Sequence, residues 1–232
     1  MNEPNRSASR VALACIALAA VVMQGCAPPG TYSKVRSSVR KAAVRVLGPA
    51  DRYDVSTSRD SVQRLLDGRL ARVEIHGVNV RPAPGYYIDD VFVKARNVKV
   101  DRKRNTVEGA DETLLTGVVK EGSFAKMLIG NIPLTDPKVT IGNDAVEVRG
   151  TYALAGAIPL EVTARGQVRM SGPQEIAFVA DSVKAGPLPL PISMSKSFDF
   201  SKIYEPLVLT GVTTEPGQAV LTGTIDWSKV KP

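Results

Sequence analysis

Apolar and polar side chains alternate with a period of two over long stretches of this chain. The pattern is unbroken between residues 158 and 170 and returns over residues 146–154 and 221–227. Successive side chains of a β-strand point to opposite faces of a sheet, so this pattern predicts antiparallel strands with one face toward solvent and one face covered. Turn-forming residues, Asn143-Asp144 and Ser171-Gly172-Pro173, separate these runs.

Two earlier strands change phase part-way along. Over residues 70–80 the apolar side chains switch faces across Gly77, and over residues 91–100 they switch faces after Asn97. A phase change within a strand is typical of a β-bulge, and bulges bend sheets. We therefore expect a strongly curved antiparallel sheet.

Helical periodicity appears mainly before the strands. Residues 32–47 place valines, alanines and a leucine on one stripe and lysines and arginines over the rest, and Gly48-Pro49 ends the pattern. A second helix is expected over residues 58–66, before Gly68, and a third over residues 123–129 with Ser123 as its cap. The predicted class is α+β, with the sheet wrapped around one or two N-terminal helices.

The first of these helices has two interpretations. A basic amphipathic helix can lie on an acidic membrane, or it can cover a sheet and expose its charges to water. The apolar stripe consists of small residues and valine, without tryptophan or phenylalanine. That composition favours packing against the sheet.

The N-terminus is typical of an exported bacterial lipoprotein. Arg6 and Arg10 precede an apolar run, residues 11–23, which suits a signal peptide and is short for a membrane span. Gly25-Cys26 at its end resembles a lipobox, in which the cysteine is acylated and becomes the new N-terminus. An uncleaved signal anchor and a secreted protein cleaved elsewhere are the alternatives.

These features divide the chain into a signal peptide (1–25), a short tether (26–30) and one folded domain (31–232). Cys15 would leave with the signal peptide and Cys26 would carry the lipid, so the domain would contain no disulfide. The expected location is the cell envelope, facing the periplasm or the cell exterior.

The positive net charge has two interpretations, anionic partners or a solubilising charged surface. The chain carries +7, and loss of Arg6, Arg10 and Glu3 with the signal peptide gives +7 − 2 + 1, or about +6. For an exported protein such partners are lipid headgroups or acidic glycans, whereas nucleic acid is not expected.

A curved sheet with a continuous apolar face needs more cover than short helices provide. An apolar groove or tunnel that takes an acyl chain would use the remaining surface, and a sheet closed over a filled core is the alternative. Three prolines between Gly186 and Ile192 exclude a central strand and predict an extended segment at an edge or rim. That segment would be an apolar lip over the groove or an edge that seals the core.

The sequence contains little that indicates an enzyme. The single histidine, His76, lies in a predicted strand, and no nucleophile, phosphate-loop or zinc motif is present. Asp89 and Asp90 would point to opposite faces of their strand. We therefore expect no catalytic residues, no metal and no cofactor.

Glycines and apolar runs along most of the chain resemble a known family. The segments that carry the resemblance are Gly68-Arg69-Leu70, Val73 to Val80, Val91 to Val100, Thr116-Gly117-Val118-Val119, the helix near Phe124, Val139 to Gly150, Pro187-Leu188-Pro189-Leu190-Pro191, Leu209-Thr210-Gly211-Val212 and Ala219-Val220-Leu221-Thr222-Gly223. From about residue 59 to residue 225 the chain is similar to the LmeA-like phospholipid-binding family of bacterial envelope proteins. The resemblance implies a fold like that of the tubular lipid-binding (TULIP) proteins, phospholipid binding, and a role in envelope upkeep.

Combined, these expectations give a membrane-anchored lipoprotein that binds a phospholipid or glycolipid. Its groove would be lined by Phe124, Met127, Leu128, Leu188, Leu190, Ile192, Met194, Phe198 and Phe200. Lys126 and Lys184 would meet the headgroup. A scaffold lipoprotein that docks an envelope protein is the alternative, and it predicts an exposed apolar patch instead of a cavity. An envelope glycan enzyme would need two acids facing each other across a cleft.

Overall fold

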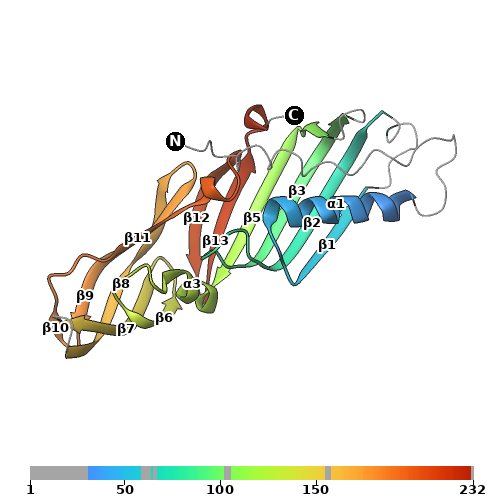
Figure 1. Ribbon diagram of the computed structural model, residues 1–232. Helices are drawn as coiled ribbons and strands as arrows, with labels where there is room; N and C mark the ends of the chain where they lie inside the picture. The colour runs from blue at the N-terminus through green and yellow to red at the C-terminus, as the bar shows by residue number, and fades with distance from the viewer. Residues whose placement is uncertain (1–30, 59–63, 65–66, 102–105, 155–157, 231–232) are drawn as a thin grey trace, which may run out of the picture.

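The computed structural model describes residues 31–58, 64, 67–101, 106–154 and 158–230. Within them the chain forms two open antiparallel sheets and two α-helices, which confirms the α+β class. The two sheets lie end to end in an elongated molecule (Figure 1). The predicted signal peptide, Cys26, the tether and most of the predicted helix 58–66 lie outside the described residues.

The first sheet combines strands from both ends of the domain. Its order is β1-β2-β3-β5-β13-β12, with β4 beside β3. The strands are β1 (Arg52–Thr57), β2 (Arg69–Val80), β3 (Ile88–Asp101), β4 (Thr106–Gly109), β5 (Glu112–Lys120), β12 (Leu207–Glu215) and β13 (Gln218–Ile225). The predicted strands 70–80, 91–100 and 221–227 correspond to β2, β3 and β13.

The second sheet is formed by the chain between β5 and β12. Its order is β10-β9-β8-β7-β6, and β11 also pairs with β9. The strands are β6 (Thr135–Ile141), β7 (Val146–Leu154), β8 (Ile158–Gly172), β9 (Glu175–Ala185), β10 (Leu188–Pro189) and β11 (Ser195–Asp199). The proline-rich segment therefore lies at an edge, as predicted, because its prolines cannot donate to a ladder.

Helix α1 (Thr31–Leu47) lies across one face of the first sheet, which we call the inner face (Figure 1). Its buried side chains, Val35 and Ala43, belong to the predicted apolar stripe. Gly48 follows the helix with a φ of 89°, and a Cβ there would lie 2.6 Å from the carbonyl oxygen of Arg81. The structure therefore confirms that this helix packs against the sheet.

The phase change predicted after Asn97 in β3 occurs there, whereas the one predicted across Gly77 in β2 occurs two residues later, at Asn79. The bulge that was the predicted cause is absent from the pairing of these two strands. The register between these strands is continuous from the Leu70–Val98 pair to the Val80–Ile88 pair, without a bulge. Asn79 and Asn97 instead adopt left-handed backbone conformations, with φ values of 53° and 49°. Such a residue turns the following side chains to the other face without adding a residue, and asparagine tolerates this conformation well.

Helix α3 (Glu121–Leu128) packs against the second sheet and anchors the larger core. It begins two residues before the predicted start, after Lys120, so Ser123 is not its cap. Phe124, Met127 and Leu128 are buried, as the periodicity predicted. The Phe124 ring lies 5.8 Å from the Phe198 ring and 6.4 Å from the Phe178 ring, measured between centroids.

Tyr53 connects the end of α1 to the edge of the first sheet. Its hydroxyl donates a 2.8 Å hydrogen bond to the carbonyl oxygen of Gly48, and burial raises the pKa of Tyr53 from 10.0 to about 12. We expect Tyr53→Phe to lower the free energy of unfolding by about 1 kcal/mol at neutral pH, because a partly buried carbonyl loses its donor. Chemical denaturation of both proteins measures this.

The same substitution should alter the alkaline stability profile. A raised pKa means that the folded state holds its proton where the unfolded chain has lost it. This contribution is therefore complete below pH 10 and disappears as the pH rises toward about 12. Stability of the wild-type protein should fall more steeply across that window than stability of Tyr53→Phe, and parallel profiles would contradict the assignment.

Candidate functional site

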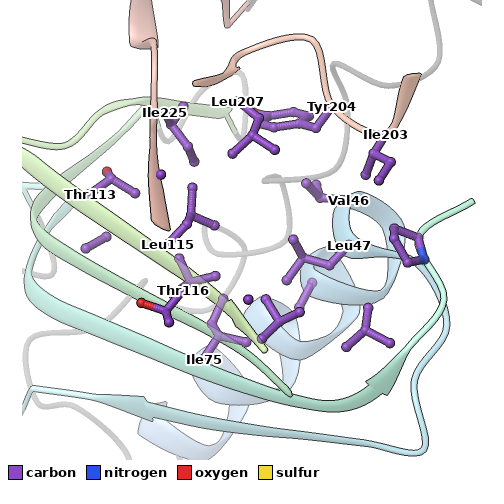
Figure 2. Close-up of a pocket in the computed structure, with 18 of the residues that line it drawn as sticks. Val46, Leu47, Ile75, Thr113, Leu115, Thr116, Ile203, Tyr204, Leu207 and Ile225 are labelled. Carbon is purple, nitrogen blue, oxygen red and sulfur yellow. The ribbon is translucent and has the colours of Figure 1, made fainter. Parts of the chain in front are cut away.

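A cavity of about 210 Å³ lies between α1, the inner face of the first sheet and the segment from Phe200 to Leu207. Figure 2 shows Val46 and Leu47 of α1, Ile75 and Leu115 of the sheet, and Tyr204 and Leu207 around the same hollow. The lining residues are Ser38, Val39, Ala42, Ala43, Val46, Leu47, Leu70, Val73, Ile75, Val80, Pro82, Ile88, Val91, Val93, Ala95, Val98, Val107, Thr113, Leu115, Thr116, Gly117, Phe200, Ile203, Tyr204, Leu207, Leu209, Leu221, Thr222, Gly223, Ile225 and Trp227.

Strand register brings these side chains to one face. Ile75 pairs with Val93, Val93 with Leu115, and Leu115 with Gly223, which gives a row across four strands. Because side chains alternate along each strand, the residues between these rows point to the opposite, outer face. The apolar wall of the cavity is therefore a direct result of the period-two pattern.

The space itself arises because small residues face each other. Helix α1 contributes Ser38, Ala42 and Ala43 to the lining, and β5 contributes Gly117 from the sheet. A single helix with short side chains cannot fill the width of a sheet of this size. The lining residues Val46, Leu115 and Ile225 are accordingly only half-buried.

None of the described residues that line the cavity carries a charge. The indole N–H of Trp227 donates to the hydroxyl of Thr113 at 3.2 Å, and the hydroxyl of Thr224 donates to the carbonyl oxygen of Thr113 at 2.8 Å. A wall of aliphatic side chains without acids, bases or cations can bind apolar groups through the hydrophobic effect, and it offers no group for proton transfer.

Two short caps position the far rim of the cavity. The carboxylate of Asp199 accepts hydrogen bonds from the hydroxyl and the backbone N–H of Ser201, at 2.6 and 3.0 Å, which lowers the pKa of Asp199. The hydroxyl of Tyr86 donates to the carbonyl oxygen of Asp199 at 2.8 Å. These contacts hold the 3₁₀ turn η2 (Phe200–Lys202), and Asp226 caps η3 (Trp227–Lys229) in the same way.

The predicted lining residues lie mostly elsewhere. Phe200 borders the cavity. Phe124, Met127, Leu128, Met194 and Phe198 are buried in the core beside the second sheet. Leu190 and Ile192 are half-buried, and Leu188 is 66% exposed. Helix α3 and the second sheet pack closely, so the buried side chains among these residues form a core outside the lining of the cavity.

The predicted headgroup residues also lie away from the cavity. Lys126 is exposed on α3, with its Nζ 5.8 Å from the centroid of the Tyr87 ring. Lys184 is exposed on β9 in the second sheet. The residues that sequence reasoning missed are those of α1 and of the first sheet. Their signal was the small-residue stripe of α1 facing glycine-containing strands.

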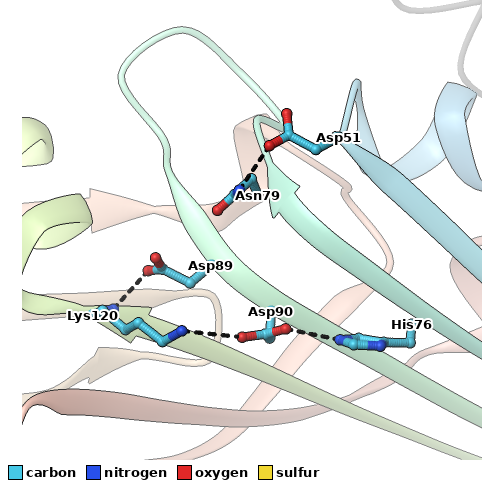
Figure 3. Close-up of polar contacts among 6 residues, drawn as sticks. All are labelled: Asp51, His76, Asn79, Asp89, Asp90 and Lys120. Carbon is cyan, nitrogen blue, oxygen red and sulfur yellow. Dashed lines mark hydrogen bonds and ion pairs between the residues drawn. The ribbon is translucent and has the colours of Figure 1, made fainter.

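A polar cluster spans β2, β3 and the end of β5 (Figure 3). His76 Nε2 lies 2.8 Å from Asp90 Oδ1, and Lys120 Nζ lies 3.7 Å from Asp90 Oδ2. The carboxylate of Asp89 instead accepts a 2.7 Å hydrogen bond from the backbone N–H of Lys120. His76 also stacks on Phe92, with ring centroids 4.3 Å apart. The cluster ties three strands together and contains no nucleophile.

Within the described part of the chain, no group of three or more acidic, histidine or cysteine side chains is arranged to hold a metal ion. No helix there combines the length and the apolar character that crossing a bilayer requires. No protein-family model, curated protein or solved structure matches the chain.

Alanine substitutions at two glycines in one row of the first sheet would test whether the cavity has room for an added side chain. Gly77 and Gly117 both pair with Val91, so they share a face. A Cβ at Gly77 would lie 2.6 Å from the Tyr53 ring, whereas a Cβ at Gly117 would make ordinary contacts, 3.6 Å from Ile88 and 3.7 Å from Leu221.

We therefore expect Gly77→Ala to lower the free energy of unfolding by about 1–3 kcal/mol, as overpacking does. Gly117→Ala should change it by less than about 0.5 kcal/mol, as surface substitutions usually do. Urea denaturation of the two variants makes the comparison. Equal losses in both would mean that the space in front of Gly117 is occupied.

Proposed function

We propose that this protein is a membrane-anchored envelope lipoprotein that binds an acyl chain of a phospholipid or glycolipid in the cavity beneath α1. The uncharged lining is the observation that carries this proposal. A hydrocarbon chain would cover apolar wall that α1 leaves open, and each buried methylene contributes about 0.8 kcal/mol. The binding is non-catalytic and serves lipid transfer or envelope maintenance.

We also propose a family relationship and a lipid anchor for this protein. A helix across an open sheet, with an apolar hollow between them, supports kinship with the LmeA-like proteins and with the tubular lipid-binding fold. Acylation of Cys26 would hold the domain at a membrane surface, where lipid is available. The headgroup would remain outside the cavity, because the described lining residues offer no charge to receive it.

The distribution of exposed apolar side chains favours lipid binding over the scaffold alternative. On the outer face of the first sheet the large exposed apolar residues are Phe92, at 36%, and Leu114, at 45%. They are flanked by charged groups such as Lys94, which pairs with Leu114, and Glu74, which pairs with Lys94. A docking site for a partner protein normally presents a contiguous apolar patch of several hundred Å².

Leu114 and Leu115 give a matched pair of variants for the test. They are neighbours on β5, but Leu115 faces the cavity and Leu114 faces outward. We expect Leu115→Trp to reduce the lipid that copurifies with the protein by at least about tenfold, because the indole occupies space that the acyl chain needs. Leu114→Trp should retain wild-type lipid. Native mass spectrometry after gentle solubilisation measures the bound lipid.

A second blocking variant, Val46→Phe, fills the cavity from the helix side and guards against a folding defect in Leu115→Trp. Thermal unfolding confirms that each variant is folded before its lipid content is compared. Wild-type protein without any bound lipid, or lipid retained by both folded blocking variants, would overturn the proposal.

A further inference from the structure

Helix α1 has a second face that the cavity does not use. Its exposed side chains include Arg36, Arg40, Lys41 and Arg45, and the helix contains no acidic residue. We call these four residues the basic face. At 1.5 Å per residue they span about 14 Å along the axis.

The basic face is not neutralised by the rest of the described structure. No ion pair joins its four side chains to another described residue. Cations on the strands behave differently: Arg52 lies 2.8 Å from Asp54, Arg81 lies 3.4 Å from Asp51, and Arg96 lies 3.2 Å from Glu112. The helix therefore concentrates positive charge that no acidic side chain among the described residues pairs with.

The arrangement of the four charges suits a flat anionic surface. At 100° per residue, Arg36 and Arg40 lie on one side of an outward ridge, and Lys41 and Arg45 lie on the other. Ser33, Ser37 and Val44 form that ridge, and all three are exposed. Short residues between two rows of long cationic side chains let every charge reach one plane, as snorkelling side chains do at membrane interfaces.

We propose that the basic face of α1 is a docking surface for the anionic phospholipid headgroups of the membrane that holds the protein. This inference rests on the proposed function, because the tether limits the distance to that membrane. From Cys26 to Thr31 are five residue steps of at most about 3.6 Å, so α1 begins within about 18 Å of the anchored cysteine. A tether of this length lets the helix reach the membrane surface, where clusters of four or more basic residues bind acidic lipids electrostatically.

Docking in this way differs from insertion. The apolar stripe of α1 contacts the sheet, with Val35 and Ala43 buried, so it is not free to enter the bilayer. The attraction is therefore electrostatic and is weakened by salt. It also places the cavity directly behind the helix that meets the membrane, since the inner face of the same helix lines it.

The test uses the mature lipoprotein reconstituted into vesicles. A fluorophore attached through Ser37→Cys reports on the ridge of α1, because the sequence after Cys26 contains no other cysteine. Quenching by an acceptor on the lipid headgroups is compared in vesicles of phosphatidylcholine with and without phosphatidylglycerol. We expect strong quenching only with phosphatidylglycerol, and loss of it at about 1 M salt, where the Debye length is roughly 3 Å.

Charge variants provide the matched control. Replacing Arg36, Arg40, Lys41 and Arg45 with Gln keeps good helix formers and should weaken docking by at least about tenfold, since each basic residue near an acidic membrane contributes several-fold. Replacing Lys138, Arg165, Arg169 and Lys184 with Gln removes the same charge from exposed positions of the second sheet. That variant should dock like the wild type.

The outcomes separate docking from anchoring and from lipid binding. Flotation with neutral vesicles reports the acyl anchor, and native mass spectrometry reports the lipid in the cavity. If the protein floats but quenching does not depend on phosphatidylglycerol, the docking surface is refuted while the anchor stands. If it does not float with neutral vesicles, salt-sensitive binding to phosphatidylglycerol vesicles still measures docking, and its absence overturns the inference. Equal effects of the two quadruple variants would mean that net charge, and not α1, is recognised.

Discussion

One helix cannot cover the inner face of a seven-stranded sheet, and the functional architecture depends on that mismatch. The strands place apolar rows across β2, β3, β5 and β13, while α1 faces them with serine, alanine and valine. Interiors normally pack to the density of organic crystals, whereas these apolar rows are incompletely covered. Beside the second sheet, by contrast, apolar side chains cover the apolar surface. The Phe124, Phe178 and Phe198 rings fill the equivalent region and form a solid core.

Sequence periodicity predicted strands β2, β3, β7, β8 and β13, the first helix and the α+β class because each depends on local alternation. It did not predict the site, because the site depends on which elements face each other. The aromatic and proline-rich segments drew attention to the second sheet, yet Phe124 and Met194 are ordinary core residues there. The lining of the cavity comes from small and aliphatic residues whose role appears only after β5 pairs with β13. The phase change at Asn97 was predicted and the one at Asn79 was placed two residues early, at Gly77, because the pattern alone does not distinguish a left-handed residue from a bulge.

The two faces of the first sheet carry different kinds of side chain and make different interactions. The inner face is apolar and incompletely covered, whereas the outer face carries the His76–Asp90–Lys120 chain and paired ions along the strands. Exposed pairs of this kind contribute little stability individually. Their more evident effect is to keep the outer face polar, so that apolar ligands meet only one side of the sheet.

Chain topology also has a consequence for biogenesis. Strand β5 pairs with β13 although the whole second sheet lies between them in sequence, so two neighbouring strands are separated by about a hundred residues. Such distant pairing is slow, because the entropy of closing a long loop opposes it. A chain crossing a membrane from its N-terminus would therefore expose the bare edge of β5 until its last strands emerge. Pairing of β5 with β13 would complete the apolar wall late in folding, and until then the open edge of β5 would be the natural target for a protein that shields it.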